Sequence, residues 1–146
     1  MPEMKTLKHD IEKVYEWLNE IEGRAGWLEP NHSKALAILR AVLQEIRDHI
    51  PINSLAHFSA QLPLVIKGML FEGWNPEHNH IKQRKSEEFI AAVIERLPES
   101  YQYNDIDIEI DAVITTLANK IDYNEFEKLF KILPENIRKL FEYVIN

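Results

Sequence analysis

Apolar residues recur at steps of three and four along most of the chain, and this spacing predicts amphipathic helices. The first run covers residues 7–22, where one face carries Leu7, Ile11, Val14, Tyr15, Leu18 and Ile21. Gly23 and Gly26 are expected to break this helix, because glycine has a low helix propensity. Trp27 follows in the loop, where its large ring is predicted to cover the core.

The stretch 39–76 holds several helix signals and helix stops. Asn31 is a suitable N-cap for a second helix, and Pro51 is expected to end it. The apolar positions of this helix are Leu36, Leu39, Leu43, Ile46 and Ile50. Asn53 is predicted to cap a short helix, and Pro63 to start another.

The sequence Glu-Gly-Trp-Asn-Pro at 72–76 is predicted to end that last helix. Gly73 suits the left-handed position just after a helix, where other residues are strained. Trp74 is then placed to fold back on Met69, and Pro76 prevents the helix from continuing. This structural interpretation outweighs a ligand-binding role for Trp74.

An internal repeat decides how the second half is interpreted. Residues 105–111 alternate between acidic and apolar side chains like a half-buried strand, but Ile106, Ile110 and Val113 also fit a helix. Without a gap, 41–71 aligns with 112–142, and the identical pairs are Ala41/Ala112, Val42/Val113, Ile50/Ile121, Asn53/Asn124, Leu62/Leu133, Pro63/Pro134 and Ile66/Ile137. Average composition would give roughly two identities. The alternating stretch is therefore predicted to start a long helix.

These patterns predict an all-α fold, in which a single domain over 1–146 has about eight helices in two tandem four-helix repeats. Repeat one covers about 6–76, a polar linker covers 77–85, and repeat two covers about 86–146. Ser86 is expected to cap the first helix of repeat two. The halves are expected to share one core, since four short helices bury too little surface.

The segments Ala60-Gln61-Leu62-Pro63 and 72–76 resemble a bacterial family catalogued only as a domain of unknown function with two helical repeats. The resemblance runs from about Gly26 to the end of the chain. Many relatives resemble RAVLHALRD in the long helix, where this chain has Gln44 in place of His, which weakens a metal role there. The resemblance implies an all-α fold with globin-like orthogonal helix packing, and it implies no activity.

The charge balance makes nucleic acid an unlikely partner, because the net charge is −7 and nucleic-acid binding needs a basic face. The chain has no Cys, which excludes disulfides and thiol chemistry. The N-terminal stretch has no apolar signal core, and no run approaches the ~18 apolar residues of a membrane span. We therefore expect a cytoplasmic protein without a membrane segment.

Candidate chemistry is sparse. No Ser lies in a nucleophile-elbow pattern, and we predict no catalytic residue and no cofactor. His49 and His57 align with Lys120 and Lys128 in the repeat, so both imidazoles are expected to be solvated. His78 and His80 in the linker could bind a transition metal, but a closed site needs about four ligands. A metal there is therefore weighed as a minor alternative.

A polar patch is predicted beside the core of the first repeat, formed by Arg40, Arg47, Gln61 and Glu72. These positions carry different residues in the second copy, so the shared fold does not require them. One interpretation is that Arg47 and Glu72 pair to join two helices. The other is that the patch, with Trp74 nearby, presents an Arg to an anionic group of a partner.

Two functional hypotheses follow. The first is a non-enzymatic helical interaction module that binds a protein partner or itself, with apolar residues such as Ile38 expected to be exposed. The alternative is a metal-dependent or hydrolase-like enzyme with a site near the linker. That enzyme would use Glu77, His78 and His80, together with Asp48.

Overall fold

The computed structural model describes residues 4–78 and 85–139. Within those ranges the chain is helical and contains no strand, which confirms the predicted all-α class and single domain. The helices are α1 (Met4–Ala25), α2 (His32–His49), α3 (Ile52–Ser59), α4 (Leu64–Phe71), the 3-10 turn η1 (Pro76–His78), α5 (Ser86–Arg96), α6 (Ile106–Lys120), α7 (Tyr123–Ile132) and α8 (Glu135–Arg138). Eight helices as such, the repeats and a globin-like arrangement stay predictions.

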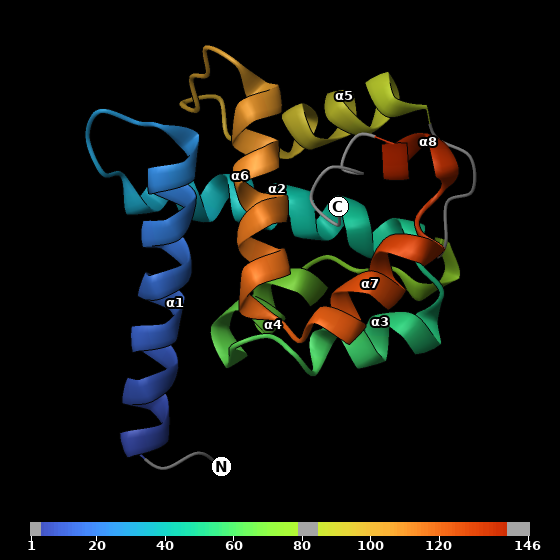
Figure 1. Cartoon of the computed structure of the whole chain (residues 1–146), viewed down its shortest axis with the longest axis horizontal. Coiled ribbons are helices and arrows are strands. Elements are labelled where there is room, and N and C mark those ends of the chain that lie inside the picture. The colour runs from blue at the N-terminus through green and yellow to red at the C-terminus, as the bar shows by residue number, and fades with distance from the viewer. Residues whose placement is uncertain (1–3, 79–84, 140–146) are drawn as a thin grey trace.

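The longest helices form two antiparallel pairs. Figure 1 shows α1 and α6 upright beside each other, and α2 and α5 running across the molecule. Side-chain contacts fix the direction of the first pair, because Glu20 meets Asn119 while Trp27 meets Glu109. Each pair thus combines one helix from either half of the chain.

The core surrounds α2, which is buried along most of its length. Fully buried side chains come from every long helix, among them Ile21, Ile38, Leu39, Leu43, Ile46, Ile50, Phe89, Ile110 and Leu117. The expectation that Ile38 is exposed is therefore wrong. Its position on the central helix places it against neighbours on all sides.

Helix α4 has its two ends capped by other helices. At its start, the Asp10 carboxylate of α1 accepts hydrogen bonds from the backbone N–H groups of Leu64 (2.7 Å) and Val65 (3.2 Å). Gly73 follows its end with φ +71, as predicted. Trp74 packs edge-on against Phe71 at 5.3 Å between ring centroids, whereas the prediction placed it on Met69.

Several predicted helix boundaries are confirmed and others move. Asn31 caps α2 by accepting a hydrogen bond from the Lys34 N–H at 3.0 Å, and the 105–111 stretch does begin a helix, with Asp105 as its N-cap. Asn53 and Ser86 are not caps, because both lie inside their helices: α3 begins at Ile52, after Pro51, and α5 begins at Ser86 itself, after Lys85.

Gly23 does not break α1. The helix continues through Gly23 and ends at Ala25, just before Gly26, whose φ is +73. An isolated Gly costs a helix only about 1 kcal/mol, so packing against α6 outweighs the local preference.

Candidate functional site

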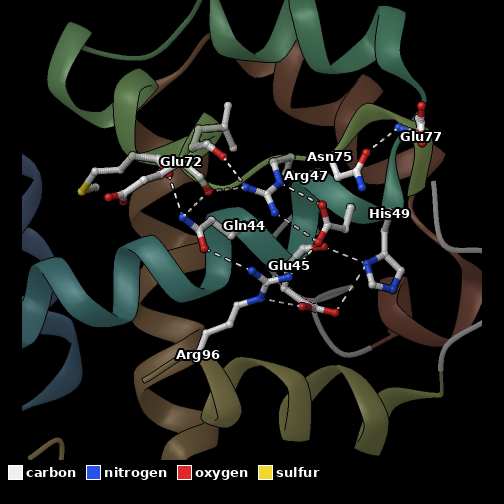
Figure 2. Close-up of polar contacts among 11 residues, drawn as sticks. Gln44, Glu45, Arg47, His49, Glu72, Asn75, Glu77 and Arg96 are labelled. Atoms are coloured by element: carbon white, nitrogen blue, oxygen red, sulfur yellow. Dashed lines mark hydrogen bonds and ion pairs between the residues drawn. The ribbon is translucent and has the colours of Figure 1, made fainter. Parts of the chain in front are cut away.

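A buried network of polar side chains joins α2 to the end of α4 and to α5. We call it the α2 polar network; its members are Gln44, Glu45, Arg47, Asp48, His49 and Arg96 (Figure 2). Five of these residues lie on the last turns of α2, and Arg96 is the last residue of α5. Because α2 is central, its polar residues are enclosed together with its apolar ones.

The first task of this network is to bind the end of α4. The last carbonyls of a helix have no partner within the helix and carry partial negative charge. Arg47 Nη1 donates to the backbone oxygens of Leu70 and Glu72, each at 3.0 Å. Gln44 Nε2 donates to the Met69 oxygen at 2.9 Å and to the Glu72 oxygen at 3.3 Å. The side chains of α2 thus cap α4.

The second task is to connect α2 to α5. The Arg96 guanidinium donates to Glu45 Oε2 at 2.9 Å, Gln44 Oε1 at 3.1 Å and Asp48 Oδ2 at 2.7 Å. Arg47 Nε also donates to Asp48 Oδ1 at 2.8 Å. Two guanidinium groups therefore balance two carboxylates, as enclosed charges require.

His49 is buried, which overturns the prediction that its imidazole is solvated. Its Nδ1 lies 2.7 Å from the Glu45 carbonyl oxygen, and its ring meets Phe89 of α5 edge-on at 5.9 Å. The alignment with Lys120 misled, because the long Lys120 side chain reaches Glu20 of α1 at 3.7 Å. His57 is exposed, as predicted.

The predicted polar patch is brought together in part. Arg40 Nε donates to Glu72 Oε1 at 2.7 Å, with both side chains about half exposed, and Arg47 binds the Glu72 carbonyl oxygen instead of its carboxylate. Gln61 lies exposed before the start of α4, while Glu72 follows its end. Eight helical residues span about 12 Å, so Gln61 does not join the others. Trp74 is partly buried against the core.

The linker site for a metal is described only in part. His80 and the side chain of His78 lie outside the described residues, and Glu77 is exposed, with its backbone N–H bound to Asn75 Oδ1 at 3.0 Å. Asp48 is held by Arg47 and Arg96. Within 4–78 and 85–139, no cluster of three His, Asp or Glu side chains could hold a metal ion.

A second polar cluster encloses Glu109 under the α1–α2 loop. Trp27 Nε1 donates to Glu109 Oε2 at 3.3 Å, and the Tyr101 hydroxyl donates to Oε1. Burial, followed by the hydrogen bond and charge of Glu109, raises the pKa of Tyr101. Lys34 Nζ lies 4.5 Å from the Trp27 ring centre and 5.1 Å from that of Tyr101. Trp27 thus covers the core as predicted, while its pairing with Glu109 carries no signal in the sequence.

The first half of α1 exposes the start of the apolar stripe predicted from the sequence, together with Met4. The exposed fractions are 79% for Met4, 36% for Leu7, 49% for Ile11 and 49% for Tyr15. Leu64 (49%) and Val65 (46%) of α4 extend this surface. We call these six residues the α1 face. Ile11, Tyr15 and Val65 also line a groove of about 260 Å³ that reaches Leu36 of α2.

The two features differ in what they can do chemically. In the α2 polar network, Gln44, Arg47 and Arg96 donate to other members of the network and to the last carbonyl oxygens of α4, which is a structural role. The α1 face instead offers apolar area to solvent, and contiguous exposed apolar area typically marks an interaction site. The sequence did not reveal the exposure of the α1 face. Periodicity shows which face of a helix is apolar, but not how far along the helix other elements cover that face.

Among 4–78 and 85–139, no helix combines the length and the apolar character that crossing a bilayer requires. A family model described as "Uncharacterized conserved protein (DUF2267)" matches residues 14–140 of the chain. No curated protein matches the chain.

Proposed function

The chain belongs to the family described as "Uncharacterized conserved protein (DUF2267)", and we propose that it is a non-enzymatic helical module that binds protein through the α1 face. The observation that carries this proposal is the exposure of Leu7, Ile11 and Tyr15, which continue the buried stripe of Val14, Leu18 and Ile21. One continuous apolar stripe on α1 is thus buried in the core in its second half and exposed to solvent in its first half.

The way the polar groups are used supports this class of function. A catalytic site needs reactive groups that face a space open to substrate. In the α2 polar network, Arg47 and Arg96 are bound to carboxylates and carbonyl oxygens of the same chain. The alternative, a metal-dependent or hydrolase-like enzyme, would use Asp48, but this carboxylate is paired with Arg47 and Arg96. A cytoplasmic location and a bacterial origin stay predictions.

We also propose that the fold contains the predicted repeats. An offset of 71 residues relates the ends of α2 and α6, at His49 and Lys120. The same offset relates the starts of α3 and α7, at Ile52 and Tyr123, and those of α4 and α8. The α1 and α5 helices then pack on the opposite repeat, and this exchange would join the two repeats into one module.

Site-specific crosslinking in cells tests the binding function. A photoreactive phenylalanine analogue replaces Ile11 in one variant and Lys128, an exposed residue of α7, in the control. We expect irradiation to give one discrete protein adduct from position 11 and none from position 128. No adduct at position 11, or the same adducts at both positions, would overturn the proposal.

A further inference from the structure

We infer that the protein bound at the α1 face is a second copy of this chain, packed antiparallel along α1. This inference rests on the proposed function, and it adds the identity of the partner. The exposed stripe has the spacing of one face of a helix, because Met4, Leu7, Ile11 and Tyr15 follow one another at steps of three, four and four. A second amphipathic helix therefore fits it better than a flat apolar surface.

The charges beside the seam favour pairing with itself. At about 100° per residue, Lys8 and Glu12 flank the stripe on one side, and Lys5 and Glu16 lie on the same side but farther round the helix. All four are exposed. The opposite side is occupied, because Asp10 there caps α4. The open flank of the seam is thus basic in its first two turns and acidic in the next two.

Antiparallel packing makes these charges complementary. When Leu7 of one copy lies opposite Ile11 of the other, like flanks face each other, so that Lys8 of each copy comes near Glu12 of its partner, with Lys5 and Glu16 at the outer edge of the same flank. A two-fold axis forms every such contact twice. Parallel packing about a two-fold axis would instead set this flank against the Asp10 side of the partner helix, which α4 already occupies.

The cations on this flank are available for such contacts. Within the described residues, neither Lys5 nor Lys8 has an ion-pair partner, and Glu12 meets only the exposed His9, at 4.0 Å. On the side of the stripe where Asp10 caps α4, Leu64 and Val65 of α4 extend the apolar surface beyond α1. A partner helix in the seam would therefore contact both α1 and α4.

Charge reversal provides the test, by sedimentation of the full chain. The acidic variant is Lys5→Glu with Lys8→Glu, and the basic variant is Glu12→Lys with Glu16→Lys. We expect wild type to sediment as a dimer at micromolar concentrations and above. Each variant should dissociate at least ~tenfold more readily, since every contact is lost twice. A mixture of the two variants should restore the dimer, because each lysine pair then meets a glutamate pair.

The matched control reverses Lys128 and Lys131, two exposed lysines of α7 with ion-pair partners on their own helix. This variant should remain as dimeric as wild type. Circular dichroism confirms that every variant is folded, since all substituted side chains are exposed. A monomeric wild type, a mixture that stays monomeric, or an equal loss in the α7 control would overturn the inference.

The crosslinking result separates this inference from the proposed function. A position-11 adduct with a different protein, together with a monomeric wild type, would overturn self-association and leave the binding function standing. An absence of any adduct together with a monomeric wild type would overturn both. An adduct between two copies of the chain supports both.

Discussion

Arg40 and Arg47 lie two turns apart on α2, and both meet Glu72, yet their surroundings differ. The Arg47 side chain is 4% exposed and binds the carbonyl oxygens of Leu70 and Glu72. Replacing it with Met keeps most of the stem but leaves these oxygens and the Asp48 carboxylate short of a donor. We expect Arg47→Met to lower the free energy of unfolding by about 3 kcal/mol, measured by urea denaturation.

Arg40→Met is the matched control. Its ion pair with Glu72 is 40% exposed on the arginine side, and such surface pairs contribute less than about 1 kcal/mol. The expected loss is therefore small. If both variants lost the same unfolding free energy, Arg47 would contribute no more to stability than a surface arginine. That result would contradict its role as a cap of α4 and favour the interpretation of Arg47 as a recognition residue.

Asp111 on α6 predicts a pH effect. Its Oδ1 is buried without a hydrogen-bond partner among the described residues, and burial, followed by the charge of Asp107, raises the pKa of this carboxyl. The folded state then binds a proton more tightly than the unfolded state, so ionisation costs stability as the pH rises above the usual Asp pKa of about 3.9. Asp111→Asn should raise the free energy of unfolding at pH 7, because the amide carries no charge to desolvate.

Acidic solution supplies the control for this variant. Below the usual Asp pKa both states carry the protonated acid, so thermal unfolding should show Asp111→Asn and wild type converging there. A gain of the same size at all pH values would mean that packing, and not ionisation, is responsible.

Individual caps and apolar positions could be predicted at the residue scale, whereas buried polar contacts could not. Asn31 as an N-cap and Gly73 in the left-handed region depend on neighbours within a few residues. The burial of His49 and the Arg96 contacts to Glu45 depend on α5 lying along α2. A pattern along one helix contains no information about which helix packs beside it.

At the scale of the elements, the last carbonyl groups of α1 and α4 receive their hydrogen bonds in two different ways. Both are followed by a glycine with positive φ, Gly26 and Gly73. At the end of α1, Gly26 N–H donates to the Gly23 oxygen at 3.2 Å and Trp27 N–H to the Glu22 oxygen at 3.4 Å, which is a Schellman cap. At the end of α4, Gln44 and Arg47 of α2 take that role.

Gly23 and Gly26 allow a paired prediction for α1. Neither has another group within 4 Å of the position that a Cβ would occupy, so their backbone conformations decide the outcome. Gly23→Ala should raise the free energy of unfolding by about 0.5–1 kcal/mol, because Gly23 is helical. Gly26→Ala should lower it by about 1 kcal/mol, because φ is +73 there. Urea denaturation measures both, and changes of equal sign would contradict the assignment of the helix end.

At the scale of the whole molecule, the antiparallel pairs join the two halves of the chain. Helix α1 lies along α6, and α5 lies along α2 (Figure 1). The sequence could predict that the halves share a core, because neither has enough helices to bury one by itself. It could not predict which helix of one half lies against which helix of the other, since that choice depends on how the surfaces fit in three dimensions.

This pairing predicts that the two halves unfold together. All the tryptophans, Trp17, Trp27 and Trp74, lie in the first half, so their fluorescence follows that half, while circular dichroism follows the whole chain. Leu129 of α7 is buried in the second half, and Leu129→Ala should cost about 2–5 kcal/mol. We expect it to shift the urea midpoints of both signals equally.

The reciprocal variant is Leu43→Ala in α2, a fully buried position of the first half. It should also move the two midpoints together, because α2 is packed against α5 and α6 as well as against its own half. If the halves were independent, Leu129→Ala would leave the tryptophan transition in place and split the dichroism curve into two steps. Coincident shifts in both variants would instead show that the exchanged helices make the chain one cooperative unit.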